Sequence, residues 1–327
     1  MKSFNKNDLE ALLACISKAV KLYCPIRQYA AGTLDFVLNF DRWEPGAGVE
    51  LSEKNTVLSP KGYFFRHHQD LYTTNVSGDI EITAAAHDSQ PFVLFGVHAC
   101  DLRGIEVLDG VFLDQPTDSF YRARREAATI VSLACPEKGR ACFCDSFGIN
   151  WTSPGGDVRI CKAGDAFTWE PLTKKGETLT ACVCEFLADD GAERQITYAN
   201  GSKLPLPQGD LLEIFNSEKW ESLSSTCIAC GTCTFLCPTC QCYDIQEFGS
   251  RGRISCHRAW DSCMNEDFTK MAHGNPRSGH IQRFRQRFMH KLVYQRASLG
   301  NHGCVGCGRC TEKCPVSLSI QKVIKSL

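Results

Sequence analysis

The residues with the most distinctive chemistry in this sequence are its 21 cysteines, which are most frequent near the C-terminus. One spacing occurs twice: three cysteines separated by two residues each, then, after three more residues, a fourth cysteine followed by proline. The first run is Cys227, Cys230, Cys233, Cys237 and Pro238, and the second is Cys304, Cys307, Cys310, Cys314 and Pro315. This spacing is typical of bacterial ferredoxins that bind [4Fe-4S] clusters.

The spacing also predicts which thiolates share a cluster. Three cysteines in a tight loop can surround one face of a cluster, whereas the fourth points away and binds the other cluster. The predicted ligand sets are Cys227, Cys230, Cys233 and Cys314 for cluster 1, and Cys304, Cys307, Cys310 and Cys237 for cluster 2. Such crossed ligation places the clusters about 12 Å apart, within range for electron tunnelling. Zinc also uses Cys-x2-Cys pairs, but it leaves the third cysteine and the proline unexplained.

A second group of four cysteines lies in the N-terminal half. Cys100 and Cys135 each follow a short apolar run that predicts a buried strand, and Cys142 and Cys144 lie in the next loop. If the two strands are parallel neighbours, their carboxyl ends meet at the sheet edge where α/β folds bind ligands. We interpret these four thiols as the ligands of a third [4Fe-4S] cluster. Their spacing alone is not diagnostic, so zinc and ordinary buried thiols stay open as alternatives.

The other nine cysteines carry weaker indications. Four come soon after the first run: Cys240, Cys242, Cys256 and Cys263. They could hold a further cluster that acts on a sulfur compound, or they could pack in the core as ordinary thiols. Five more are interpreted as structural: Cys15, Cys24, Cys161, Cys182 and Cys184.

The elements that must position these cysteines divide the chain into two predicted domains. Residues 1–215 alternate helix and strand patterns, with strands expected at 92–97 and 129–133 and a helix at 101–112. A strand, helix and strand of this length predict a parallel pair, and hence an α/β domain with a partly parallel sheet. Residues 216–327 have few β-branched runs and helical periodicity, so we expect an all-α helical dicluster ferredoxin domain there.

Composition and charge exclude several classes of protein. The 327 residues are 43% hydrophobic and 22% charged, which is ordinary for a globular protein. A net charge of −1 gives no long-range attraction to nucleic acid, and no apolar run is long enough for a membrane span. The polar N-terminus has no signal-peptide core. We therefore expect a cytoplasmic protein, in which cysteines serve as metal ligands and not as disulfides.

One charge pattern stands out between the two cysteine runs. Residues 268–311 contain eight Lys or Arg and no Asp or Glu. Cations near a cluster would stabilise its reduced form and raise its potential. A solvated basic face, or a docking patch for an acidic partner, is the alternative.

Several stretches resemble one known family of iron–sulfur proteins. They are 96–105 (GVHACDLRGI), 142–148 (CFCDSFG), 238–245 (PTCQCYDI), 260–263 (WDSC) and 285–291 (RQRFMHK). The family comprises the two-cluster iron–sulfur subunit of anaerobic sulfite reductase together with the beta subunit of cytoplasmic sulfhydrogenase, and it has relatives in heterodisulfide-reductase-type complexes. The resemblance covers residues 58–327, and His98 departs from it where the family often has arginine. It implies electron relay from a flavin-containing subunit to a catalytic subunit of a hetero-oligomer.

The expected function is therefore electron transfer within a larger anaerobic oxidoreductase complex. The chain has no Gly-x-Gly-x-x-Gly motif after a strand, so a flavin or nicotinamide is expected on a partner. Single electrons would pass from a flavin, NAD(P)H- or ferredoxin-linked partner to a catalytic subunit of sulfite reductase, hydrogenase or heterodisulfide reductase type. The alternatives are a catalytic subunit that reduces a sulfur compound at an extra cysteine-ligated cluster, and a zinc-stabilised interaction module.

Overall fold

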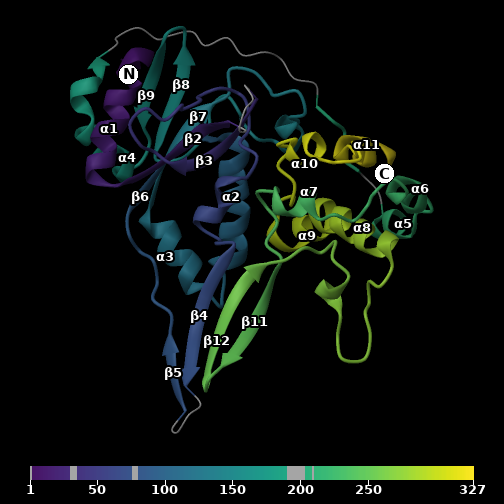
Figure 1. Ribbon diagram of the computed structural model, residues 1–327. Coiled ribbons are helices and arrows are strands. Elements are labelled where there is room, and N and C mark those ends of the chain that lie inside the picture. The colour runs from purple at the N-terminus through teal and green to yellow at the C-terminus, as the bar shows by residue number, and fades with distance from the viewer. Residues whose placement is uncertain (1, 30–34, 76–79, 190–202, 208–209) are drawn as a thin grey trace.

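The computed structural model describes residues 2–29, 35–75, 80–189, 203–207 and 210–327. Figure 1 shows a large sheet flanked by helices in the N-terminal half and a group of short helices in the C-terminal part. A narrow second sheet extends away from both. Within the described residues, no helix combines the length and apolarity needed to cross a membrane.

The large sheet has eight strands, and its central part is parallel. Its strands, in spatial order, are β10 (Ala188–Asp189), β1 (Lys2–Asn5), β9 (Ala166–Pro171), β8 (Val158–Ala163), β7 (Ala128–Ala134), β6 (Phe92–His98), β2 (Lys21–Tyr29) and β3 (Phe36–Arg42). β2, β6, β7 and β8 run parallel to their neighbours in this series, and the outer pairs are antiparallel. The predicted α/β architecture with a partly parallel sheet is confirmed.

Helices cover both faces of this sheet, which explains why every residue of β6 is buried. On one face, α1 (Leu9–Ala19) and α4 (Lys174–Cys182) pack over Val93, Phe95 and Val131. On the other face, α2 (Ala99–Phe112) and α3 (Ser119–Ala127) pack over Leu94 and Ile130. Continuous apolar runs are typical of strands buried on both faces, and they correctly predicted β6 and β7.

The prediction of an all-α C-terminal domain is wrong. β11 (Tyr243–Ser250) and β12 (Arg253–Trp260) form a hairpin, and β12 also pairs with β4 (His68–Asn75), which pairs with β5 (Glu81–Ala84). All these pairings are antiparallel. The hairpin turns at Arg251 and Gly252, both with positive φ, as in the tight turns that match strand twist. The partner strand β4 lies far away in the sequence, so local periodicity did not reveal the sheet.

The rest of the C-terminal part is helical. Its helices are α5 (Leu211–Asn216), α6 (Lys219–Ser224), α7 (Thr232–Phe235), α8 (His280–Met289), α9 (Gln295–Leu299), α10 (Arg309–Glu312) and α11 (Ile320–Ser326). A π-helical turn, His290–Tyr294, joins α8 to α9. Short 3-10 turns lie in both parts of the chain, at Lys6–Asp8, Pro60–Tyr63, Cys144–Phe147 and Cys184–Phe186 in the N-terminal part and at Asp267–Thr269 in the C-terminal part. Trp220, Phe284 and Phe288 form the centre of the core that these helices share.

Candidate metal centres

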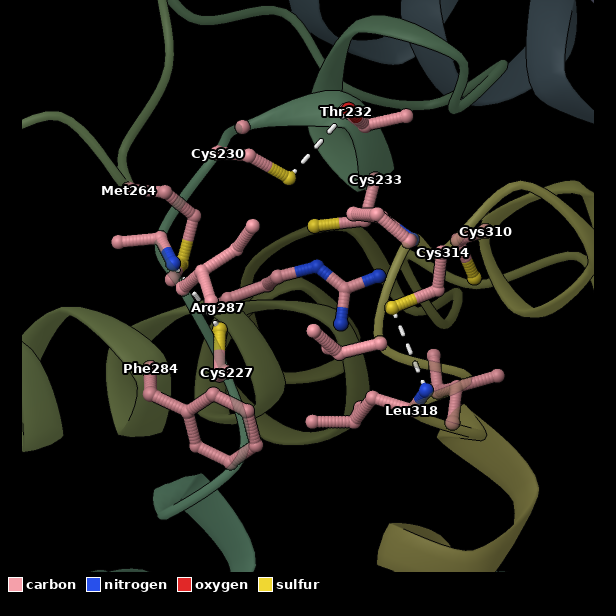
Figure 2. A pocket seen from close by; sticks show the side chains of 16 residues that line it. Cys227, Cys230, Thr232, Cys233, Met264, Phe284, Arg287, Cys310, Cys314 and Leu318 are labelled. Atoms are coloured by element: carbon pink, nitrogen blue, oxygen red, sulfur yellow. Dashed lines mark hydrogen bonds between the residues drawn. The ribbon is translucent and has the colours of Figure 1, made fainter.

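Three cavities among the described residues are each lined by four or five cysteines, and the first lies at the loop before α7. We call it cavity 1. It brings together all four residues predicted for cluster 1, Cys227, Cys230, Cys233 and Cys314, and Cys310 also lines it. Figure 2 shows these sulfurs around the guanidinium of Arg287. Cys230 is exposed to solvent, so this cavity lies close to the surface.

Cavity 2 is lined by Cys237, Cys304, Cys307 and Cys310, the four residues predicted for cluster 2. Cys310 lines both cavities 1 and 2, so the two are direct neighbours. Burial raises the pKa of Cys304 to about 12. Metal binding therefore has to displace a proton from this thiol, as is usual for cysteine ligands.

Cavity 3 is lined by Cys100, Cys135, Cys142 and Cys144, the four residues of the predicted third cluster. Cys307 also lines it, so cavity 3 borders cavity 2. Burial raises the pKa of Cys144 to about 11. The three cavities thus form a row in which each adjoining pair shares one cysteine.

The carboxyl edge of the large sheet positions cavity 3. β6 and β7 are parallel, with His98 opposite Leu133 at their carboxyl ends. Cys100 lies in the first turn of α2, directly after β6, and Cys135 follows β7. This is the arrangement that the strand–helix–strand pattern predicted.

The second cysteine run packs backbone against backbone on the loop that carries Cys142 and Cys144. Phe143 N–H donates to the Gly306 carbonyl at 2.7 Å. Gly306 has φ of 62°, and a Cβ there would lie 2.6 Å from the Phe143 carbonyl carbon. Only glycine allows so close an approach in this conformation. The approach explains how cavities 2 and 3 come to share a wall.

Asn55 joins cavities 2 and 3, and the sequence contained no signal for it. Its amide nitrogen donates to the Cys307 carbonyl at 2.8 Å and to Cys142 Sγ at 3.5 Å. Its amide oxygen accepts from the thiol of Cys100 at 3.6 Å. His98, the departure from the family pattern, contacts the same oxygen through Nδ1 at 3.2 Å.

Two buried cations, Arg287 and Lys291, lie beside cavities 1 and 2. Arg287 lines both cavities, is 4% exposed, and its Nε has no hydrogen-bond partner among the described residues. Lys291 is also 4% exposed, and its amino group donates to Cys237 Sγ at 3.0 Å. Burial alone would lower both pKa values, but the thiolate charges, Cys233 foremost for Arg287 and Cys237 for Lys291, raise them well above the ordinary range.

These cations provide a test of whether an anionic cluster fits. Within the described part of the chain, neither Arg287 nor Lys291 forms an ion pair with a carboxylate. A buried, unpaired charge is strongly destabilising. A [4Fe-4S] cluster with four thiolates is an anion, so the donor set and the cations fit such a group. No three Cys, His, Asp or Glu side chains in the described residues are placed to hold a single metal ion.

A buried ion pair joins cavity 3 to the second cysteine run. Arg309 binds Asp101 through two hydrogen bonds of 2.8 Å, and the side chains are 2% and 1% exposed. Arg309 Nε also donates to the Thr56 carbonyl at 2.7 Å. The pair connects residues next to Cys100 and Cys310, so it fixes cavity 3 relative to the C-terminal part.

The structure separates the cysteines that the sequence left open. Cys242 and Cys263 flank the two ends of the β11–β12 hairpin, and Cys240 comes two residues before Cys242. Cys256, in contrast, lies within β12, opposite Tyr72 and Glu247. Cys24 and Cys161 are buried in the large sheet. Cys15 donates to the Cys182 carbonyl at 3.2 Å, near the exposed Cys184.

The fold and the repeated cysteine loops define an iron–sulfur electron-transfer protein. The family model described as a 4Fe-4S dicluster domain matches residues 226–318, which contain both runs, and this supports two [4Fe-4S] clusters. The chain is 31% identical over 319 residues to sulfhydrogenase 2 subunit beta of Pyrococcus furiosus, covering 93% of this chain and 91% of that protein. The chain belongs to the sulfhydrogenase beta-subunit family. No solved structure gives a significant match.

Proposed function

We propose that this chain relays single electrons along a row of three [4Fe-4S] clusters in cavities 1, 2 and 3. The observation that carries the proposal is that each adjoining pair of cavities shares a cysteine in its lining. Cys310 lines cavities 1 and 2, and Cys307 lines cavities 2 and 3. Clusters in adjoining cavities would be close enough for electron tunnelling without any intermediate carrier.

The proposed ligands are the twelve cysteines assigned from the sequence, with crossed ligation between the two runs. The clusters supply one-electron redox chemistry, and the protein sets their spacing and potential. Arg287 and Lys291 stabilise the added negative charge, and the tight Gly306–Phe143 contact holds cavities 2 and 3 together. We also propose that residues 1–215 and 216–327 are two domains, connected by the Asp101–Arg309 pair.

The proposed partners are a reductase subunit that contains flavin, together with a catalytic redox subunit, in a cytoplasmic hetero-oligomer. The relative's name identifies it as one subunit of a sulfhydrogenase, which supports a hydrogenase-type complex. Both ends of the row are accessible. Cys230 is exposed at cavity 1, and an open groove lined by Glu53, Lys54 and Arg140 reaches Cys142 of cavity 3.

The test uses the isolated, anaerobically purified chain. We expect dithionite to reduce its clusters, and we expect the reduced chain, once freed of dithionite, to pass electrons to artificial dyes. We expect no turnover of hydrogen, sulfite or nicotinamide, because those reactions belong to the proposed partners. Rapid turnover of NADH without a partner, or failure of the dithionite-free, reduced chain to reduce dyes, would contradict the proposal.

A second candidate function is reduction of a sulfur compound by this chain itself. The observation that favours it is the position of three further thiols: Cys240 and Cys242 follow Cys237 of cavity 2 in the sequence, and Cys263 lies at the other end of the β11–β12 hairpin. Reduction of a polysulfide by the isolated chain with dithionite as donor would distinguish this candidate from a pure relay.

A further inference from the structure

The loop that carries Asn55 is held between the large sheet and the second cysteine run. On the side of the sheet, Val57 N–H donates to the Leu38 carbonyl in β3 at 2.7 Å. On the side of the cysteine run, Arg309 is only 2% exposed, and its Nε donates to the Thr56 carbonyl at 2.7 Å. The backbone directly after Asn55 is therefore fixed from two sides, so the fold determines where the Asn55 side chain lies.

The orientation of the Asn55 amide follows from its partner in the second cysteine run. One end of the amide lies 2.8 Å from the Cys307 carbonyl oxygen. A carbonyl oxygen can only accept a hydrogen bond, so this end is the amide nitrogen, and the amide oxygen faces Cys100 and His98. The nitrogen carries a second proton, and its other partner is Cys142 Sγ at 3.5 Å. One amide group thus contacts a proposed ligand of cluster 2 and a proposed ligand of cluster 3.

This amide becomes more important when Cys142 loses its proton. In the metal-free protein the Cys142 thiol itself donates to the Cys307 carbonyl at 3.5 Å. A cysteine that binds iron is a thiolate, so that bond is lost and two hydrogen-bond acceptors face each other. The two N–H groups of Asn55 can bind both acceptors at once. Asn55 therefore allows a thiolate of cavity 3 to lie beside the backbone of a cluster 2 ligand.

A donor to cysteine sulfur also affects the potential of a cluster. Reduction adds negative charge to the sulfurs, so an N–H group that points at one of them stabilises the reduced form. At cavity 2 the donor is charged, because the Lys291 ammonium donates to Cys237 Sγ at 3.0 Å. At cavity 3 the corresponding donor to Cys142 is the neutral amide of Asn55. Its effect opposes that of the Glu53 carboxylate, which lines the same cavity.

We propose that Asn55 is a positioning residue of the relay. Its amide holds Cys142 of cluster 3 against the backbone of Cys307 of cluster 2, and its N–H···S hydrogen bond raises the potential of cluster 3. The inference rests on the clusters proposed for cavities 2 and 3 and adds a residue that acts through their cysteine ligands. It does not depend on the partner subunits.

The first experiment is a redox titration of the full-length, anaerobically reconstituted chain, monitored by electron paramagnetic resonance. The cluster 3 signal is the one lost in the double variant Cys142→Ala with Cys144→Ala. Asn55→Leu keeps a similar volume but removes the donor, so cluster 3 should become harder to reduce. The equilibrium constant for electron transfer from cluster 3 to cluster 2 should rise about tenfold, which is about 59 mV for one electron. An unchanged potential of cluster 3 would overturn the inference.

The matched control is Asn39→Leu, which loosens the same loop without touching a cysteine. Asn39 Oδ1 accepts from Leu58 N–H at 3.2 Å, and Asn39 does not line cavity 3. We expect the wild-type potential in this variant. Equal shifts in both variants would show that the packing of the loop matters and the hydrogen bond does not. If the Cys142 and Cys144 variant loses no signal, the third cluster itself is disproved, and the role of Asn55 with it.

A second measurement needs no variant and therefore does not depend on the folding of one. The wild-type chain is prepared with asparagine labelled with ¹⁵N in the side-chain amide, and cluster 3 is reduced. Asn55 is the only asparagine that lines cavity 3 among the described residues. Pulsed electron paramagnetic resonance should therefore show a ¹⁵N coupling on the cluster 3 signal, because the amide nitrogen is hydrogen-bonded to a ligand sulfur. A cluster 3 signal without this coupling would overturn the inference and leave the proposed relay intact.

Discussion

Cavities 1 and 2 lie beside two buried cations that have no carboxylate partner among the described residues, whereas cavity 3 is lined by the carboxylates Glu53 and Glu137. Arg287 and Lys291 contact the first two cavities without an acidic partner in the described residues. At cavity 3 both cations are already paired: Lys138, which lines the cavity, with Asp145, and the buried Arg309 with Asp101. Burial raises the pKa of Cys135, and Asp101 and Glu53 are among the charges that raise it further. The two regions thus offer opposite environments to an anionic group.

The difference suggests a direction for electron flow. Reduction adds a negative charge to a cluster, so uncompensated cations favour it and nearby carboxylates oppose it. One unit charge about 7 Å away changes a free energy by about 2 kcal/mol at an effective dielectric constant near 20. For a one-electron couple this corresponds to about 100 mV. We therefore expect cavity 3 to have the lowest potential and electrons to move from it toward cavity 1.

The largest effect is expected when two of the proposed cluster ligands of cavity 3 are removed. The double variant Cys142→Ala with Cys144→Ala should lose about four iron atoms per chain, because two of the four thiolates of cavity 3 are gone. The spectroscopic signals of the two other clusters should persist. Cys182→Ala, which changes an exposed thiol away from the cavities, is the control. Unchanged iron in a folded double variant, or zinc in place of iron in the wild type, would contradict the assignment.

The next largest effect is expected when the buried ion pair between cavity 3 and the C-terminal part is broken. Asp101→Asn leaves Arg309 buried without a counter-charge, which should lower the free energy of unfolding by about 3–5 kcal/mol. The exposed Arg103–Glu106 pair on the same helix provides the control, and Glu106→Gln should cost less than about 1 kcal/mol. Thermal denaturation of both variants measures the difference. Equal losses would show that the buried pair does not hold the regions together.

The third prediction changes the charge at cavities 1 and 2. Arg287→Met should lower the potentials of both clusters by about 100 mV, because a buried cation that contacts both cavities is removed. Arg285→Met on the same helix is the matched control, since Arg285 packs against Phe215 and lines neither cavity. Redox titration measures both variants. A shift confined to one cluster, or one equal to that of the control, would show that Arg287 does not tune both.

The smallest effect tests the packing between the regions. A Cβ at Gly104 would lie 2.6 Å from Pro238 Cβ, next to Cys237, so Gly104→Ala should cost about 1–2 kcal/mol. Gly110→Ala on the same helix meets only ordinary contacts and should gain about 0.5–1 kcal/mol. Thermal unfolding should therefore show shifts of opposite sign. A stabilising Gly104→Ala would mean that α2 does not pack tightly against the Cys237 loop.

The sequence was most informative where the chemistry depends on local spacing. Each cysteine run places its first three thiols within seven residues, so the dicluster region could be predicted without any tertiary structure. Cavity 3 could be predicted only through the topology of the sheet. That topology was predictable because buried strands appear in the sequence as continuous apolar runs. The predicted strand, helix and strand agree with β6, α2 and β7, so Cys100 and Cys135 lie at the expected edge of the sheet.

The features that escaped prediction depend on contacts between distant segments. Arg309 and Asp101 are 208 positions apart, and Asn55 reaches Cys307 across 252 positions. Neither pairing leaves a local pattern. The β11–β12 hairpin forms its sheet with β4, which lies far away in the sequence. The helical periodicity of the segments around the hairpin dominated the local pattern, so its two strands were not predicted. The separation of Cys256 from Cys242 and Cys263 became visible only once that hairpin was known.

The most direct test of the charge comparison is a redox titration monitored by electron paramagnetic resonance. It would compare the anaerobic wild-type chain with the Cys142→Ala and Cys144→Ala double variant. We predict that the signal lost in the variant is the one that is reduced at the lowest potential in the wild type. If the lost signal is instead reduced at the highest potential, the cations at cavities 1 and 2 do not set the order and the proposed direction of electron flow is wrong.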